Sequence, residues 1–499
     1  MYPTTLDRIP QVKQTFLHIL SQISPISHLF RTNNPPSDLE LQQLVPILRH
    51  VNTVLCEFDR LDADGSLTAV SEPLEHLHDA LQGAISPIRR LPTEILSQIF
   101  LECLPCLLIC DERTFWNSLN NDEPPWTLTR VSRRWREVAL RDQRLWSSLD
   151  LDKKGLESLR KLRLCLQRSG NSPLSIDCIY PANARPLLNL LSIHSARWKH
   201  IKIRGYLIEH CTRVKGKLPQ LETLEIWRWP DVNRCDTFAV APMLRHIEVW
   251  DSLAPIRIPW HQIESLKVHS ISGLAGIFAS APQLSQFFLY WFEVAGLNWN
   301  RISLAKHSGI KTVYIEEISV LKKLELSSLE SLEVADTVSL PVPLSQITHF
   351  ITRSFCRLQT LILSEVDIHE EPEIRALFDC TQSLVNLTIK DSWRRYKTDW
   401  SIVMHILTIA PSQPTSIARL ENITFDFKDK APLNFLLLLE MLESRAGLEI
   451  DEANQVCHLK SINLYNLPNP PEGQAFSVVL RLHKLRSLGI RMNLDPVLF

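Results

Sequence analysis

Apolar residues in the later two thirds of the chain recur in the phrase Leu-x-x-Leu-x-Leu, in which Ile, Val, Phe or Trp can replace Leu. Its alternating last positions predict short strands that are buried on one face. Early copies start at residues 198, 221, 244, 263, 284 and 310, so they lie 19 to 26 residues apart. Later copies start at 329, 358, 384, 420, 459 and 485. Their wider spacing predicts insertions between the strands.

This phrase and this period are typical of leucine-rich repeats, in which each unit supplies one strand and one helix or looser segment. Stacked units form a parallel sheet with one continuous core. The sequence therefore predicts an α/β fold class, with an irregular leucine-rich-repeat solenoid over residues 151–499 that starts loosely at Pro173–Cys178.

The phrase also predicts which residues face outward. Its first, fourth and sixth positions point into the core, and its third, fifth and seventh positions form columns on the other face of the sheet. Exposed aromatic residues are enriched at binding interfaces. The following outward residues form a candidate target-binding surface: Arg204, Trp227, Trp250, His269, Phe288 and Tyr290. The alternative is that the rings stack into a stabilising ladder, or that a loop such as 291–300 covers them.

Residues 1–85 carry apolar stripes at helical spacing, which predict a helical region. Pro46 lies inside one stripe and should end or kink its helix. Sustained heptads are missing, so a helical hairpin is favoured over a long coiled coil. Dimerisation through these helices is the alternative.

Two further helices are predicted between residues 88 and 149. Leu91-Pro92-Thr93-Glu94 is typical of a helix start, because proline is tolerated in the first turn and an early glutamate suits the helix dipole. An apolar face follows, made by Ile95, Leu96, Ile99 and Phe100. The second helix would have an arginine-rich face and, opposite it, an apolar face. The apolar face comprises Leu128, Val131, Trp135 and Val138.

Three parts of this stretch resemble the F-box, a three-helix motif that binds an adaptor protein. They are the Leu-Pro-x-Glu-Ile-Leu opening from Leu91, the Val-Ser-Arg-Arg-Trp-Arg-Glu-Val-Ala middle from Val131, and the Leu-Trp close at Leu145. With its lead-in from Ser86, the stretch is similar to F-box proteins that are abundant in mushroom-forming fungi. The 101–126 insert departs from a compact F-box.

The resemblance implies that the chain docks on the small adaptor subunit of an SCF-type ubiquitin ligase, and through it on a cullin. The residues implied to make this contact are Leu91, Pro92, Ile95, Leu96, Ile99, Leu128, Val131 and Trp135.

Composition and charge bear on the possible partners of the chain and on its cellular compartment. The chain has 499 residues, too many for one hydrophobic core, and a net charge of −1. Neutral charge gives no reason to expect nucleic acid or a membrane surface as partner. The 11 cysteines are odd in number and scattered, and no secretory signal opens the chain. These features predict a cytoplasmic or nuclear protein with reduced thiols.

Candidate chemistry is sparse. Asp62–Gly65 mimics a calcium loop, but two of the key ligand positions fail, so a turn is favoured. Cys103, Cys106 and Cys110 lack a fourth metal ligand nearby, so buried thiols are favoured over zinc. The sequence contains no Gly-rich nucleotide loop, no His-Glu-x-x-His metal helix and no Gly-x-Ser-x-Gly turn. We expect no enzyme activity, no metal and no cofactor.

Together these patterns predict three parts: a helical region over 1–85, an F-box over 86–150 and repeats over 151–499. The predicted function is a substrate-recognition adaptor, whose repeats bind an unknown protein target. The alternative is a non-catalytic leucine-rich-repeat interaction scaffold outside any ubiquitin ligase.

Overall fold

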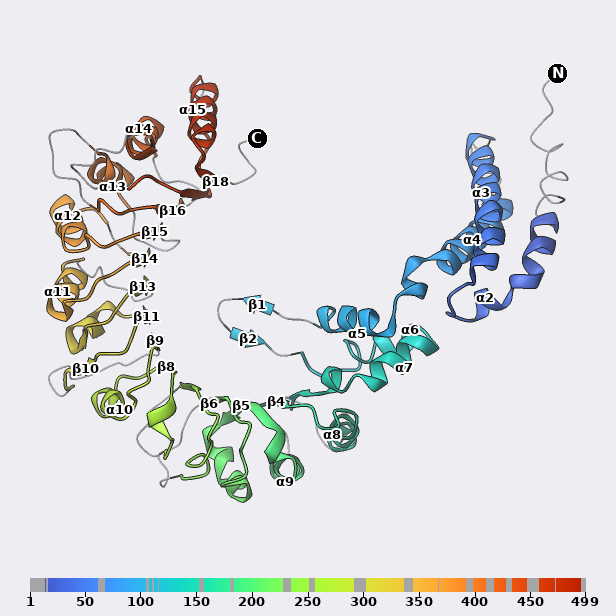
Figure 1. Cartoon of the computed structure of the whole chain (residues 1–499), viewed down its shortest axis with the longest axis horizontal. Helices are drawn as coiled ribbons and strands as arrows, with labels where there is room; N and C mark the ends of the chain where they lie inside the picture. The colour runs from blue at the N-terminus through green and yellow to red at the C-terminus, as the bar shows by residue number, and fades with distance from the viewer. Residues whose placement is uncertain are drawn as a thin grey trace. The chain divides into compact units, whose positions relative to one another are not determined.

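A computed structural model gives the fold (Figure 1). It describes residues 14, 17–61, 68–104, 107–109, 112–114, 116–151, 157–179, 184–227, 235–250, 256–290, 302–335, 344–366, 368–391, 398–409, 417–427, 433–446, 457–471 and 473–494. The contacts divide the chain into two compact units, Met1–Leu190 and Leu191–Phe499. The predicted start of the repeat region, residue 151, lies inside the first unit.

The first unit opens with helices, as the apolar stripes predict. They are η1 (Ser24–Ile26), α2 (His28–Arg31), α3 (Asp38–Leu61) and α4 (Thr68–Ile85). α3 and α4 pack on each other, and their shared core includes Leu44, Val51 and Leu81. The turn predicted at Asp62–Gly65 lies outside the described residues.

Pro46 does not end α3, which continues through it to Leu61. Of the two outcomes predicted at Pro46, an end or a kink of the helix, the end is wrong. A proline removes one backbone hydrogen bond, but Leu44, Ile47 and Val51 are buried on both sides of it. Their burial holds both halves of the helix in place.

The stretch that resembles an F-box forms several short elements. They are η2 (Pro87–Arg90), α5 (Thr93–Glu102), β1 (Leu107–Ile109), β2 (Glu112–Thr114), α6 (Leu128–Val131), α7 (Arg133–Arg141), η3 (Gln143–Trp146) and β3 (Ser148–Asp150). β1 and β2 form an antiparallel pair inside the 101–126 insert. α5 begins directly after Pro92, as predicted.

The predicted second helix is in fact two helices, α6 and α7. The backbone is extended at Ser132, with φ −159° and ψ 170°, and its side chain accepts a hydrogen bond from the backbone N–H of Trp135. A serine that caps a helix in this way favours a new start over continuation. The apolar spacing from Leu128 to Val138 bridges this break, which explains the wrong prediction.

A parallel sheet of 14 strands dominates the mixed α/β structure. Its strands stand in chain order and are β3, β4 (Leu174–Cys178), β5 (Trp198–Arg204), β6 (Thr223–Trp227), β7 (His246–Val249), β8 (Ser265–Val268), β9 (Gln286–Leu289), β11 (Thr312–Ile315), β13 (Ser331–Ala335), β14 (Thr360–Ser364), β15 (Asn386–Lys390), β16 (Asn422–Asp426), β17 (Ser461–Tyr465) and β18 (Arg491–Leu494). β10 (Ala305–His307) and β12 (Leu324–Leu326) form a separate parallel pair.

The predicted phase of the strands is confirmed. From β5 to β11 the first, fourth and sixth positions of every copy of the phrase are buried, as in Trp198, Ile201 and Ile203 of β5. The third positions of successive copies are register partners: His200 pairs with Thr223, and Thr223 with His246. One face of each strand therefore belongs to the core.

The last predicted strand is wrong. Leu485 lies in helix α15 (Ala475–Ser487), and β18 begins six residues later, at Arg491. Leu-x-x-Leu spacing also suits a helix. A turn at Gly489, with φ +88°, separates the helix from the strand, and glycine adopts this backbone conformation without strain.

The other helices lie between successive strands of the chain. They are α8 (Glu157–Arg168), α9 (Ala184–Ser192), η4 (Ser195–Arg197), η5 (Gly205–Val214), η6 (Trp260–Gln262), α10 (Leu274–Ser280), η8 (Ile318–Lys323), α11 (Ser345–Ser354), α12 (Glu371–Asp379), α13 (Trp400–Leu407) and α14 (Phe435–Ala446). In the second unit, α10 to α14 lie along the same side of the strands (Figure 1). We call the other side of this sheet the open face.

Among the described helices, none combines the length and the apolar character that crossing a membrane would need.

The capping role of Ser132 is testable. Replacing it by alanine removes the acceptor for the Trp135 N–H, and loss of such a cap costs about 1 kcal/mol. We expect hydrogen exchange of the α7 amides to accelerate about fivefold. Ser132→Asp, which keeps an acceptor at this position, should retain wild-type protection. Equal exchange in all three proteins would contradict the capping role.

Candidate protein-interaction surfaces

The first candidate surface is built on a small helical core in the first unit. Leu96 and Phe100, on one side of α5, are completely buried. The Phe100 ring packs on Trp135 of α7, with 4.8 Å between the ring centroids. Leu128 of α6 and Val138 of α7 are buried as well. These contacts fix which side of α5 faces inward.

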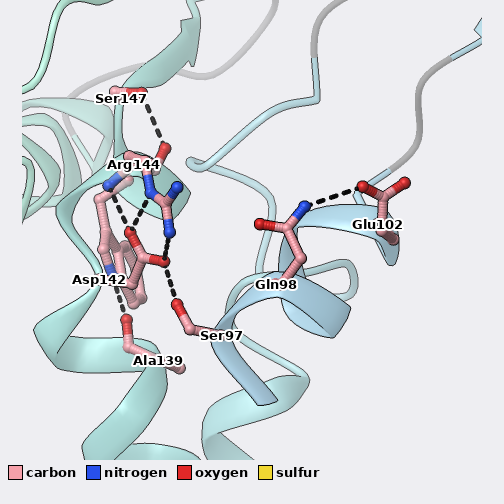
Figure 2. A network of polar contacts seen from close by, with 8 residues as sticks. Ser97, Gln98, Glu102, Ala139, Asp142, Arg144 and Ser147 are labelled. Carbon is pink, nitrogen blue, oxygen red and sulfur yellow. Dashed lines mark hydrogen bonds and ion pairs between the residues drawn. The ribbon is translucent and has the colours of Figure 1, made fainter. Parts of the chain in front are cut away.

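A polar network joins α5 to the segment that follows α7 (Figure 2). The Ser97 hydroxyl donates to the Asp142 carboxylate. Arg144 donates to the same carboxylate from Nε at 2.9 Å and from Nη2 at 2.7 Å. Burial acts to raise the pKa of Asp142, but the hydrogen bonds from Arg144 and Ser97 outweigh it and hold the pKa below its usual range. The network therefore contains a charged carboxylate at neutral pH.

Arg134 fixes the lead-in to α5. Its guanidinium donates to the backbone carbonyls of Arg89 and Leu91. Arg89 in turn donates to the carbonyls of Leu29, at 2.8 Å, and of Thr32, at 3.1 Å. Arg134 thus links α7 to the lead-in of α5, and Arg89 links that lead-in to α2 and the residue that follows it.

The end of the 101–126 insert belongs to the core. The Trp126 indole N–H donates to the Ser118 carbonyl at 2.7 Å, and its ring meets Trp146 edge-on at 5.1 Å. Trp146 donates to the Ala139 carbonyl at 2.7 Å. Arg168 of α8 covers the Trp146 ring at 4.3 Å. Apart from the tryptophans themselves, no sequence pattern predicts this cluster.

The eight residues implied to bind an adaptor have three different environments. Pro92, Ile95 and Val131 are exposed, with Ile95 at 49% and Val131 at 55%. Leu91, Ile99 and Trp135 are half-buried. Leu96 and Leu128 are buried among residues of their own chain, so a direct contact with a partner is not open to them. Ile88 and Leu140, which sequence reasoning missed, are also exposed.

Cys103 ends α5 and is exposed, so the expectation of a buried thiol is wrong for this residue. Cys106 and Cys110 lie outside the described residues. No group of three or more metal-ligating side chains occurs among the residues that the structure describes.

The second candidate surface is an aromatic ladder on the open face of the second unit, which we define as Trp227, Trp250, His269 and Tyr290. Trp227 stacks on Trp250 with 3.8 Å between centroids, and Trp250 on His269 with 3.9 Å. Tyr290 continues the stack at 5.3 Å from His269. Tyr314, which the sequence did not single out, lies 5.2 Å further along. The ladder follows from the parallel register, which places equivalent positions of neighbouring strands side by side.

Carboxylates and lysines flank the ladder. The indole N–H of Trp227 donates to Glu225, and that of Trp250 donates to Glu248 at 3.0 Å. Lys202 pairs with Glu225 at 3.0 Å and lies 4.7 Å above the Trp227 ring. Both indole N–H groups are thus satisfied within the chain.

The remaining predicted target-binding residues are Arg204 and Phe288. Arg204 is the register partner of Trp227 and lies 5.7 Å over the Tyr206 ring. Phe288 is covered on one side by Lys267, at 5.2 Å. All six predicted residues lie on outward positions, as expected. His269 is buried and the other five are half-buried.

Another column of the open face, at the third position of the phrase, is polar. In β14 to β16 its side chains are hydrogen-bonded to one another: Asn386 donates to Thr360 at 2.9 Å, and Asn422 donates to Asn386 at 2.7 Å. Ser461 extends the row by donating to Asn422 at 2.7 Å. The open face therefore combines an aromatic column with a polar column.

No protein-family model matches this chain, and no curated protein matches it significantly.

The carboxylates beside the ladder predict a pH effect. Burial, and then the neighbouring charge of Glu248, raise the pKa of Glu225. Glu225 therefore holds its proton more tightly in the folded state than in the unfolded state. The free energy of unfolding should fall as the pH rises from the ordinary glutamate pKa to the raised pKa of Glu225. We expect the melting temperature of the second unit to fall less over this pH range in Glu225→Gln. Parallel pH profiles of the two proteins would contradict this assignment.

Proposed function

We propose that this chain is the substrate-recognition adaptor of an SCF-type cullin–RING ubiquitin ligase. In this proposal residues 86–150 act as an F-box, and the later residues form an irregular leucine-rich-repeat solenoid that holds a protein target. The chain would act in the cytoplasm or nucleus.

One observation carries the proposal. Pro92, Ile95 and Val131 remain on the surface although the same short helices bury Leu96, Phe100 and Leu128. Large apolar side chains exposed on a rigid core are costly in water and are suited to a partner. Had these residues been sealed inside the chain, docking through them would not be open.

The regular strand phase supports a solenoid. Each strand of the large parallel sheet from β5 to β17 buries the fourth and sixth positions of the phrase. Such units bury their apolar faces only against their neighbours. The open face then offers columns of side chains to a target.

We propose the aromatic ladder, with Arg204 and Phe288, as part of the target-binding surface. The rings stabilise one another by stacking, yet Trp227, Trp250 and Tyr290 keep part of their surface accessible. Rigid aromatic anchors lose little entropy on binding. The ladder can therefore serve both stability and recognition.

The mechanism needs no catalytic group in this chain. Holding a target and the ligase together raises the effective concentration of target lysines near the charged conjugating enzyme. Ubiquitin transfer is then performed by other subunits.

Docking can be tested with Ile95→Asp and Val131→Asp. A charge at either position should weaken binding of the purified adaptor subunit at least about tenfold, because burying one such apolar side chain contributes about 1.5–3 kcal/mol. Isothermal titration with the full-length chain measures this. Ile193→Asp is the matched control, because Ile193 is 76% exposed and lies outside the helical core.

If wild-type protein does not bind the adaptor subunit, the chain is an interaction scaffold outside the ligase. Leu96→Ala tests the structural role of the buried apolar residues, as opposed to the docking role of the exposed ones. It should lower the free energy of unfolding by about 2–5 kcal/mol, because it opens a cavity in the core.

Target binding can be tested with Trp250→Ala and Tyr290→Ala. Proteins captured by the wild-type chain from cells under proteasome inhibition are quantified by mass spectrometry. We expect the captured amount of its target to fall several-fold in both variants. Phe355→Ala is the control, because Phe355 is 87% exposed and follows α11. Unchanged capture together with a lower melting temperature would leave the ladder a purely structural role.

A further inference from the structure

Among the strands that the structure describes, β18 is the last of the parallel sheet, and its far edge has no partner strand among them. Among the described strands its hydrogen-bonded neighbour is β17, with Arg491 opposite Ser461. The Arg491 N–H donates to the Lys460 carbonyl at 3.0 Å. Alternate residues of a parallel strand direct their backbone groups to the same side, so the N–H and C=O groups of Met492 and Leu494 point away from β17. They offer the pairing groups for one more strand.

A hollow of about 150 Å³ lies between α15 and this edge. Leu482, Met492 and Leu494 give it apolar walls, and His483 and Arg486 bring polar groups from the helix. An added strand would direct alternate side chains to this side of the sheet. The hollow has the size and position to receive one of them.

Three basic side chains lie on the two elements that form the hollow, α15 and β18. Lys484, Arg486 and Arg491 are exposed, and within the described residues none of them forms an ion pair. Glu443 is already paired with Arg481 at 2.7 Å, and the hydrogen bonds from Arg481, helped by the nearby charge of Lys484, lower its pKa. Basic groups thus flank the edge both on the helix side, through Lys484 and Arg486, and on the open face, through Arg491.

We propose that the edge of β18 and the hollow beside it dock an acidic segment of a partner protein. The segment adds to the sheet as an extended strand, and one of its carboxylate side chains enters the hollow towards Arg486. Main-chain pairing supplies affinity and the hollow supplies selectivity, as in other cases of strand addition. A second copy of this chain is disfavoured, because pairing two β18 edges would bring two sets of basic side chains together.

The probe is a fluorescein-labelled peptide of alternating Glu and Val, measured by fluorescence anisotropy with the full-length chain. We expect it to bind at least about tenfold tighter than the same peptide with Gln in place of Glu, and to weaken as salt rises. Arg486→Glu should reduce its affinity about tenfold or more. Lys217→Glu, an exposed lysine before β6, should leave its affinity unchanged. The proposal is overturned if the Glu and Gln peptides bind with equal affinity, or if Arg486→Glu binds the Glu peptide as tightly as the wild-type chain does.

Backbone pairing has its own test. Met492→Pro removes an outward N–H while keeping the hydrogen bond of Arg491 to β17, and proline is tolerated at such edge positions. It should abolish peptide binding, whereas Met492→Ala should not. If the proline variant unfolds, the acidic peptide with N-methylated valines replaces it as the test and should fail to bind wild-type chain. Retained binding of that peptide overturns the strand model.

Sedimentation of the chain alone completes the test. A dimer that Met492→Pro dissociates would identify a second copy as the occupant and overturn the acidic partner, whereas a monomer agrees with the proposal. None of these assays contains a ligase subunit, so their failure would leave the proposed ligase function untouched.

Discussion

The second unit depends on apolar contacts between equivalent positions of neighbouring strands. One strand with one helix cannot bury its own apolar face, so Ile203, Ile226 and Val249 are each covered only because the next strand repeats the pattern. The same register decides the open face. Because inward residues must stack, outward residues are forced into columns, and the aromatic ladder is one of those columns.

The helical core of the first unit obeys a different constraint. Its helices are short, and burial of Phe100 against Trp135 with the Ser97–Asp142–Arg144 network holds α5 to α7 and η3. A core so small cannot cover every apolar side chain of its helices. Ile95 and Val131 stay outside it. Because these apolar side chains are left exposed, they are available to a partner, and this supports the proposed docking surface.

Both candidate surfaces therefore arise as by-products of how each unit packs. In the parallel sheet, periodic burial leaves an open face whose chemistry can vary from strand to strand without disturbing the core. Rings occupy it around Trp250, and hydrogen-bonded amides around Asn422. At β18 the same sheet ends with outward backbone groups near Arg486. A repeating fold must either cover such an edge or use it.

The sequence by itself determined the strand phase and the outward columns, because a strand has a period of two and a slip of one residue would bury polar side chains. It also determined where α5 begins, since Pro92 and Glu94 act locally. The break at Ser132 is also local in origin, because its side chain caps the next helix, but the helical spacing from Leu128 to Val138 runs across it and hides it from the apolar pattern. Only the tertiary structure decided the last strand, since Leu-x-x-Leu at Leu485 suits helix and strand alike. Local spacing placed Ile95 and Leu96 on one face, and packing against α7 and η3 decided that Leu96 is core and Ile95 is surface.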